Sequence, residues 1–200
     1  MNCFAVQIWQ PGLDFPSIDS FDMLFICGGS MNVDQTHVHP WLIAEKEFIK
    51  SAIKNNKKMV GLCLGAQLIA DVLGAKVNRH IHSEVGWHKV NLIPFTPVLS
   101  KFESLMVFQY HSYTFALPEG AQLIAGNSAC SNQGFVLGKN ILAFQFHPEA
   151  SIDWIQSCAE DKDLPQGPYC QTAKEMIRDS IYQPPMQDWY FAGLDYLITT

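Results

Sequence analysis

Apolar and polar positions form blocks that predict strands and helices in turn along the first part of the chain. Residues 4–10 alternate weakly and predict a strand. The apolar run 21–27 predicts a buried strand that ends at Gly28 and Gly29. From 40 to 54 the apolar residues recur at helical spacing, behind a proline that is typical of the first position of a helix. This order is typical of an α/β domain.

After Met59 and Val60, which predict another short buried strand, a helix pattern runs to Gly74. Further apolar runs predict strands at 89–93, 105–110, 121–125, 135–137 and 141–146. The tail from Ser151 predicts two or three short helices, interrupted by prolines at 165, 168, 184 and 185. We therefore expect one domain over 1–200, with a mixed, mostly parallel sheet flanked by helices.

The stretch 61–65 reads G-x-C-x-G, between the predicted strand and the predicted helix. A nucleophile elbow requires this context, because small residues on both sides leave room for a sharp turn that exposes one side chain. The helix N-terminus behind Cys63 favours negative charge and presents free N–H groups. The alternative reading is that Cys63 is a small buried hydrophobe.

A candidate base follows the last predicted strand. A thiol nucleophile needs a base to take its proton, and the base needs an acceptor that orients it. His147 and Glu149 lie two residues apart, so on an extended segment they point to the same side, with Pro148 fixing the backbone between them. Together with the cysteine elbow, this pair indicates a Cys–His–Glu triad.

At this point the chain resembles the class I (triad-type) glutamine amidotransferases, and among them the stand-alone GMP-synthase-like proteins. The segments that carry the resemblance are 21–31, 61–65, 84–87, 109–112 and 144–149. The resemblance implies a three-layer, flavodoxin-like fold and a triad that hydrolyses the side-chain amide of glutamine, releasing ammonia to an acceptor. It implies no cofactor.

The resemblance also implies roles for residues around the triad. The backbone at Gly29 and the N–H of Leu64 match the two halves of the family's oxyanion hole, where each donor is worth on the order of a hundred- to a thousandfold in rate. The positions that match the family's contacts to the amino-acid end of glutamine are Gln67, Gln109, Ser112 and Tyr113. Close relatives more often carry Gly-Asp where this chain has Ser112 and Tyr113.

The N-terminal segment differs from the family pattern. Members open with a strand and a helix before the strand that residues 4–10 resemble, and here only three residues precede it. Either the start is truncated, or residues 4–10 take the place of the opening strand and 11–20 replace the first helix. The second arrangement avoids a missing central strand, whose neighbours would carry unpaired backbone groups.

Composition narrows the class of protein. The 200 residues are 48% hydrophobic, enough for one sizeable core. A net charge of −6 argues against a nucleic-acid groove, and the sequence has neither a signal-peptide pattern nor an apolar run that would cross a membrane. The six cysteines show no paired spacing, which favours a reducing compartment, and we expect the cytoplasm.

Metal binding is the rival chemistry. His37 and His39, and again His80 and His82, place two imidazoles on one face of an extended segment, as zinc sites can do. The first pair leads into a helix start and the second lies in a polar stretch. We therefore expect no metal site.

Three functions remain open. The leading one is a glutaminase unit that passes ammonia to a small acceptor or to a partner synthetase. The second is a hydrolase of γ-glutamyl amides or peptides, with water as the final acceptor. The third is a non-catalytic interaction module that keeps the fold. The chain lacks a P-loop, a dinucleotide fingerprint and the Ser-Gly-Gly-x-Asp-Ser segment of ATP pyrophosphatases, so we expect a synthetase partner for L-glutamine-derived ammonia.

Overall fold

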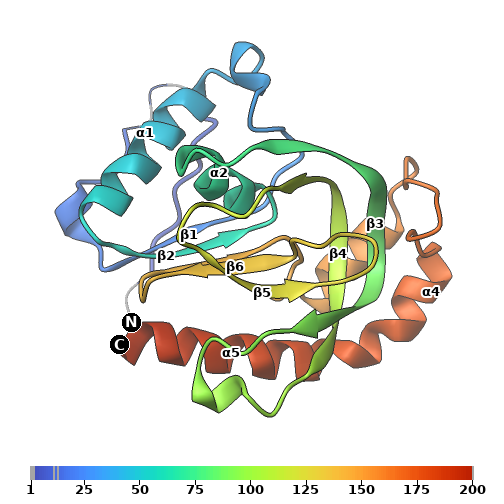
Figure 1. The fold of residues 1–200 in the computed structure, drawn as a ribbon. Coiled ribbons are helices and arrows are strands. Elements are labelled where there is room, and N and C mark those ends of the chain that lie inside the picture. Colours follow the sequence, from blue (N-terminus) through green and yellow to red (C-terminus); the bar gives the residue numbers. More distant parts are fainter. Residues whose placement is uncertain (1–2, 11, 13, 200) are drawn as a thin grey trace.

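A single mixed β-sheet forms the centre of the computed structural model, which describes residues 3–10, 12 and 14–199 (Figure 1). Its strands are β1 Met23–Ile26, β2 Lys58–Leu62, β3 Val77–Leu92, β4 Ser104–Phe115, β5 Gln122–Gly126, β6 Gly134–Leu137 and β7 Ile141–Phe144. They lie in the order β1-β2-β7-β6-β5-β3-β4. The α-helices are α1 Trp41–Lys54, α2 Leu64–Val72, α3 Ile152–Ala159, α4 Ala173–Arg178 and α5 Gln183–Thr199.

The α/β class and the mixed sheet flanked by helices are confirmed, but parallel pairing is less extensive than predicted. Only β1, β2 and β7 pair in parallel. The pairings β7–β6, β6–β5, β5–β3 and β3–β4 are all antiparallel. The short connections of the second half explain the difference, because parallel neighbours need a long crossover while antiparallel strands can be joined by a hairpin.

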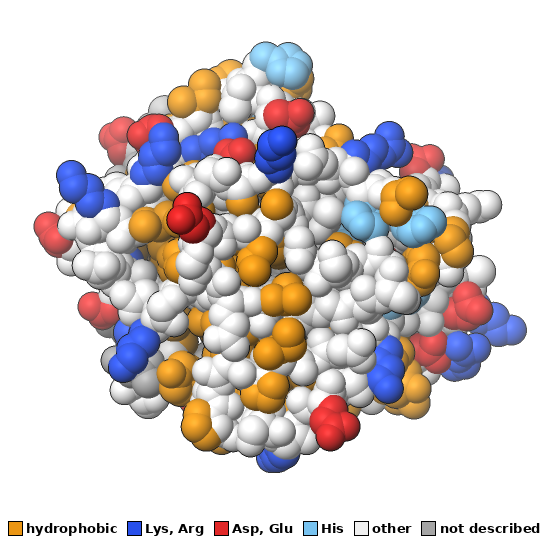
Figure 2. Space-filling model, in the orientation of Figure 1, with side chains coloured by type: hydrophobic (Ala, Val, Ile, Leu, Met, Phe, Trp, Pro, Cys, Tyr) orange, Lys and Arg blue, Asp and Glu red, His pale blue; other side chains and the backbone are white. Residues whose placement is uncertain are grey.

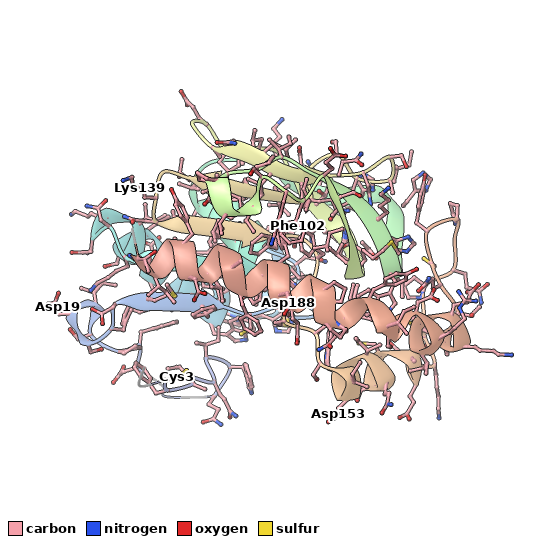
Figure 3. The ribbon with its side chains drawn as sticks, turned by 90° about the horizontal axis from the view of Figure 1, so that it is seen from below. Cys3, Asp19, Phe102, Lys139, Asp153 and Asp188 are labelled. Carbon is pink, nitrogen blue, oxygen red and sulfur yellow. The ribbon has the colours of Figure 1, made fainter. Side chains whose placement is uncertain are left out.

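Two apolar cores, one on each face of the sheet, produce three layers. On one face, α1 and α2 pack against the sheet through residues such as Ile49, Leu68 and Phe135. On the other face lies α5, which runs along the sheet in Figure 3. There Trp189 and Tyr190 place their rings 5.6 and 5.8 Å from the ring of Phe144. The aromatic C-terminal segment is thus largely core, although Phe191 is exposed.

The C-terminal helix differs in extent from the prediction. Pro184 and Pro185 do not interrupt a helix but lie in the first turn of α5, where a missing N–H costs no helical hydrogen bond. At the other end, Nζ of Lys58 donates to the carbonyls of Leu197 and Ile198, at 2.6 and 2.9 Å. The first residue of β2 therefore holds the last turn of α5.

The predicted strand at residues 4–10 is wrong. This segment is irregular and ends in a turn, and Phe4 and Trp9 are 56% and 61% exposed. It takes no place in the sheet, where β1 is the terminal strand. Of residues 11–20, positions 11 and 13 lie outside the described residues, and the remainder contains only the short 3-10 helix Ile18–Ser20.

Candidate active site

Cys63 lies at a strained turn between β2 and α2. Its backbone has φ +50° and ψ −106°, a conformation that costs a residue with a side chain on the order of 1–3 kcal/mol and that clusters at functional sites. Its N–H donates to the carbonyl of Phe144 at 2.8 Å, which fixes the turn beside β7. The thiol is thereby held at the carboxyl edge of the parallel strands.

The glycines on both sides of Cys63 are required by close contacts. A Cβ atom at Gly61 would lie 2.8 Å from the backbone nitrogen of Ala66, and one at Gly65 would lie 2.0 Å from the carbonyl oxygen of Ile26. No side chain fits at either position, because real Cβ atoms do not approach other atoms so closely. Close contacts with β1 and α2 therefore exclude a side chain at both glycine positions of the G-x-C-x-G pattern.

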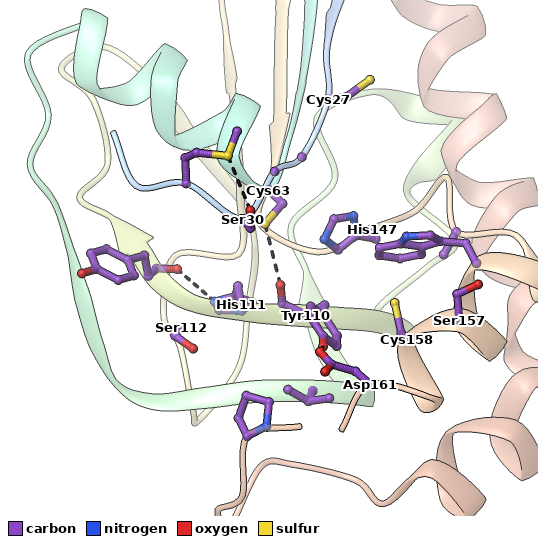
Figure 4. Close-up of a pocket in the computed structure, with 18 of the residues that line it drawn as sticks. Cys27, Ser30, Cys63, Tyr110, His111, Ser112, His147, Ser157, Cys158 and Asp161 are labelled. Carbon is purple, nitrogen blue, oxygen red and sulfur yellow. Dashed lines mark hydrogen bonds between the residues drawn. The ribbon is translucent and has the colours of Figure 1, made fainter. Parts of the chain in front are cut away.

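His147 and Glu149 follow β7 and meet as the sequence predicts. Nδ1 of His147 lies 2.8 Å from Oε1 of Glu149, and the backbone N–H of His147 donates to the carbonyl of Phe108 at 2.8 Å. The imidazole is buried, while the carboxylate side chain is 36% exposed. Figure 4 shows the His147 ring beside Cys63, above β4.

The electrostatics of the His147 ring reflect both neighbours. Burial lowers its pKa, but the negative charges and hydrogen bonds of Cys63 and Glu149 outweigh this and raise the pKa from 6.5 to about 10. Gly28 lies against both groups, because a Cβ there would be 3.0 Å from Cε1 of His147 and 3.4 Å from Cβ of Cys63. The arrangement can hold a thiolate against an imidazolium and orient the ring from its far side.

The three side chains open into a pocket of about 1150 Å³. The predicted site residues that line it are Gly29, Cys63, Gln67, Ser112, Tyr113, His147 and Glu149. Leu64 does not line it, but it is the first residue of α2, and a Cβ at Gly29 would lie 3.0 Å from Cδ2 of Leu64. The Gly29 backbone thus lies against the Leu64 side chain, and Gly29 lines the pocket with Cys63.

Gln109 is the predicted contact residue that the structure does not bring to the pocket. Its side chain is fully buried, does not line the pocket, and has no hydrogen-bond partner at either polar atom within the described chain. The residue lies in a regular part of β4 opposite Gly86. The resemblance around residues 109–112 placed this segment correctly on a strand beside the pocket. It did not show which residues of the strand reach the pocket.

The sequence did not predict Arg79, which lines the pocket, or Gln145, which is buried beside the thiol. Arg79, on β3, lines the pocket opposite Tyr113 in the strand register. Nε2 of Gln145 lies 3.7 Å from the Cys63 sulfur. Gln145 was detectable in the sequence, because it is a polar residue between two buried phenylalanines, two positions before His147. Arg79 gave no such signal within its polar stretch.

The far wall of the pocket comes from α3 and the loop after it. The ring of Trp154 lies 4.7 Å from that of His147. Tyr110 donates its hydroxyl hydrogen to Asp161 at 2.5 Å, and Cys158 lies on the same side in Figure 4. The pocket therefore continues beyond Cys63, away from Gln67 and Tyr113.

Within the described ranges, no cluster of three His, Cys, Asp or Glu side chains could hold a metal ion. His80 and His82 lie on β3 with ring centroids 6.4 Å apart. On the face drawn in Figure 2, Lys and Arg side chains are scattered among acidic ones rather than gathered in one patch. No helix in the described part of the chain has the length and apolar character needed to cross a membrane.

Comparison with known proteins gives a consistent family match. The sequence pattern of the family described as "Glutamine amidotransferase class-I" matches residues 4–154. A glutamine amidotransferase-like protein of Salmonella typhimurium (YfeJ) is 30% identical over 148 residues, which cover 70% of this chain and 62% of that protein. The glutamine-hydrolysing GMP synthase subunit of Thermoplasma acidophilum is 31% identical over 144 residues, 68% of each chain.

A solved structure agrees with the fold. The glutamine amidotransferase of Methylobacillus flagellatus superposes with a TM-score of 0.85 at 26% identity, covering 93% of this chain and 80% of that one. The chain matches only about three fifths of the length of the Salmonella protein.

Proposed function

Because the chain belongs to the class-I glutamine amidotransferase family, we propose that it hydrolyses the side-chain amide of glutamine at Cys63 and supplies the ammonia to an acceptor. The observation that carries this proposal is the strained elbow at Cys63 next to a His147 ring that is hydrogen-bonded to Glu149. Family membership supports the reaction class, and the geometry supports the choice of residues.

In the proposed reaction, the Cys63 thiolate attacks the amide carbon of glutamine. The oxyanion that forms is stabilised by the backbone N–H groups of Gly29 and Leu64. The carbon–nitrogen bond then breaks as protonated His147 gives its proton to the leaving nitrogen, which leaves a γ-glutamyl thioester and ammonia. A water molecule, losing a proton to His147, attacks the thioester, and the carbon–sulfur bond breaks to release glutamate.

The amino-acid end of the substrate would lie on the side of Cys63 away from α3, where Gln67 and Tyr113 line the pocket. Among the described lining residues, Arg79 is the one Lys or Arg. A guanidinium at this end would attract the α-carboxylate, since Arg recognises planar carboxylates through paired hydrogen bonds. The guanidinium of Arg79 thus supports an amino acid as substrate.

An ammonia acceptor is the second part of the proposal. The relative from Thermoplasma acidophilum is named as one subunit of a GMP synthase. Ammonia released into water at neutral pH becomes mostly ammonium, a poor nucleophile, so release next to an acceptor site is favourable. We propose a synthetase partner that docks over the pocket, and a cytoplasmic location, which the six free cysteines support.

Hydrolysis of larger γ-glutamyl amides is the alternative, and one observation favours it. The pocket extends past Cys63 along Trp154, Ser157 and Cys158, beyond the space that an amino group needs. In that case the leaving group would be an amine or peptide lying against α3.

One experiment separates these functions. Purified protein is supplied with glutamine and with a panel of γ-glutamyl amides, and ammonia and glutamate are measured. Amidotransferase function predicts that glutamine is preferred and that a diazo-ketone analogue of glutamine labels Cys63 alone among the six cysteines. Cys158→Ala, which removes another thiol of the pocket wall, should still be labelled at Cys63. Labelling at another cysteine, or hydrolysis of glutamine by Cys63→Ala, would contradict the assignment.

A further inference from the structure

A second carboxylate–imidazole pair lies beside the pocket, outside the proposed triad. Glu84 on β3 is fully buried, and its Oε2 lies 3.2 Å from Nε2 of His111 on β4. Asn127 donates to Oε1 of Glu84 at 2.7 Å, and Gln133 donates to Oε2 at 2.6 Å. Burial raises the pKa of Glu84, but the hydrogen bond and charge of His111 and the bond from Asn127 outweigh it and lower the pKa. The buried carboxylate is thus held by two side-chain amides and lies within ion-pair distance of the imidazole.

The other side of the His111 ring faces the pocket. Its Nδ1 lies 2.9 Å from the carbonyl oxygen of Tyr113. The same carbonyl accepts a hydrogen bond from Nε2 of Gln67 at 3.1 Å. In Figure 4, the dashed line that ends at the labelled His111 ring marks its contact with the Tyr113 carbonyl. Carbonyl and carboxylate oxygens both accept, so each ring nitrogen of His111 faces an acceptor, and the ring lies between Glu84 and the Tyr113 backbone.

The chain of contacts continues to the sulfur. Nε2 of Gln67 also donates to Oε1 of Gln145 at 3.1 Å, and Nε2 of Gln145 lies 3.7 Å from the Cys63 sulfur. The amide nitrogen of Gln67 thus donates to two acceptors. This fixes the orientation of the amide, and its oxygen is left to accept from a group in the pocket.

The strand pairing explains why side chains are needed here. β3 and β4 pair regularly except between Arg79 and Glu84, where the register shifts across from Tyr113 and His111. Tyr113 pairs with Arg79 and His111 with Glu84, so these two residue pairs flank the irregularity. A register shift locally disrupts the ladder, and the Glu84–His111 contact adds a side-chain link between the strands next to it.

We propose that Glu84 and His111 are positioning residues that hold the Tyr113 carbonyl and, through it, orient Gln67 to receive the α-ammonium group of the substrate. This inference rests on the proposed glutaminase function. The pair does not touch the reacting atoms. It acts on the choice of amino-acid substrate, because an ammonium group finds an acceptor only while the Gln67 oxygen faces the pocket.

The test compares glutamine with glutaramate, the same amide without the α-amino group, in wild type and in Glu84→Gln. We expect Glu84→Gln to lower kcat/KM for glutamine about tenfold or more, the effect of losing one hydrogen bond to a charged group, and to change kcat/KM for glutaramate little. Alkylation of Cys63 by iodoacetamide should keep its rate. The matched control is Glu45→Gln, the same change at a buried carboxylate of α1, which should leave the ratio of the two substrates unaltered.

A purely structural role of the pair would reduce thermal stability without changing the preference for glutamine over glutaramate, and that result would overturn the inference. If Glu84→Gln does not fold, His111→Gln and Gln67→Met carry the test, because each should shift the preference in the same direction. The double variant of Glu84→Gln with Gln67→Met should lose no more preference than either alone. A wild-type protein that hydrolyses neither amide would contradict the proposed function itself, whereas an active one whose preference survives these changes contradicts only the positioning role.

Discussion

At the residue scale, Glu149 is the neighbour of His147 that can be altered without touching a reacting atom. Its carboxylate lies 2.8 Å from Nδ1, and together with Cys63 it raises the pKa of His147 to about 10 against the lowering effect of burial. We expect Glu149→Gln to lower that pKa and to reduce kcat by roughly a hundredfold, because an amide stabilises the imidazolium less. An NMR titration of the His147 ring and the pH profile of kcat measure the two effects.

The same pKa shift has a consequence for stability. The folded-state pKa of His147 lies above its ordinary value of 6.5. The protonated ring therefore contributes its full stabilisation below about pH 6.5, and the contribution is lost as the pH rises toward 10. Glu149→Gln should flatten the fall of Tm across this window, while Glu119→Gln, at an exposed carboxylate, should not. An unaltered His147 titration in Glu149→Gln would exclude the pairing.

The sequence predicted the residues around Cys63 and His147 because their geometry is local. A turn between a strand and a helix positions Cys63, and two-residue spacing brings Glu149 beside His147. Gln109 and Arg79 were not predictable in this way. Their access to the pocket depends on the register of β3 against β4, which shifts between Arg79 and Glu84 and which no pattern within one strand encodes.

At the scale of elements, the contact of α2 with β1 predicts the outcome of one substitution. A Cβ at Gly65 would lie 2.0 Å from the carbonyl oxygen of Ile26, so Gly65→Ala must displace the helix from the strand. We expect a loss of about 1–3 kcal/mol or more in the free energy of unfolding, together with loss of Cys63 labelling. Urea denaturation measures the first effect.

Gly167→Ala is the matched control for Gly65→Ala. A Cβ at Gly167 would meet only the sulfur of Cys170, at an ordinary 3.8 Å. This variant should unfold at nearly the wild-type urea concentration. Equal stability of the two variants would show that the elbow tolerates a side chain at Gly65.

Helix α1 carries a buried carboxylate that opposes stability. Glu45 is 8% exposed, its Oε2 has no partner among the described residues, and burial raises its pKa from 4.5 to about 7. The cost of ionising it is absent below pH 4.5 and grows as the pH rises to 7. Glu45→Gln should therefore raise stability by about 1–3 kcal/mol above pH 7, with the gain vanishing near pH 4.5.

Thermal unfolding of wild type and Glu45→Gln at a series of pH values measures this gain. Glu47→Gln, on the exposed face of the same helix, should show no comparable dependence. A gain that stays constant from pH 4.5 to 8 would mean that ionisation of Glu45 is not its cause.

Elements with strong periodicity were predictable, and those defined by tertiary contacts were not. The helix at 40–54 and the strand before Cys63 follow from their apolar patterns and form α1 and β2. Residues 4–10 alternate only weakly, and without a neighbouring strand to pair with they stay irregular. The polar segment 77–88 became part of β3 because β4 supplies its hydrogen bonds.

At the scale of the whole molecule, the proposed synthetase partner should change the rate of the glutaminase. We expect slow hydrolysis of glutamine by the isolated protein and a rise of roughly tenfold when the partner is bound, a common size of coupling between sites. Co-purification from the native cell, with the rate measured before and after the partner is removed, tests this. A fast glutaminase that purifies alone and needs no acceptor would instead favour the γ-glutamyl hydrolase.

The position of α5 has a consequence for synthesis on the ribosome. Its aromatic side chains cover Phe144, close to the proposed base, and its last turn is held by Lys58 at the start of the strand that leads to Cys63. While α5 is still inside the ribosome, the face of the sheet that it covers is exposed, and the aromatic residues of that face are open to water. Chains cut short before this helix would be recognised by chaperones and proteases as unfinished, even though Cys63, His147 and Glu149 had all been translated.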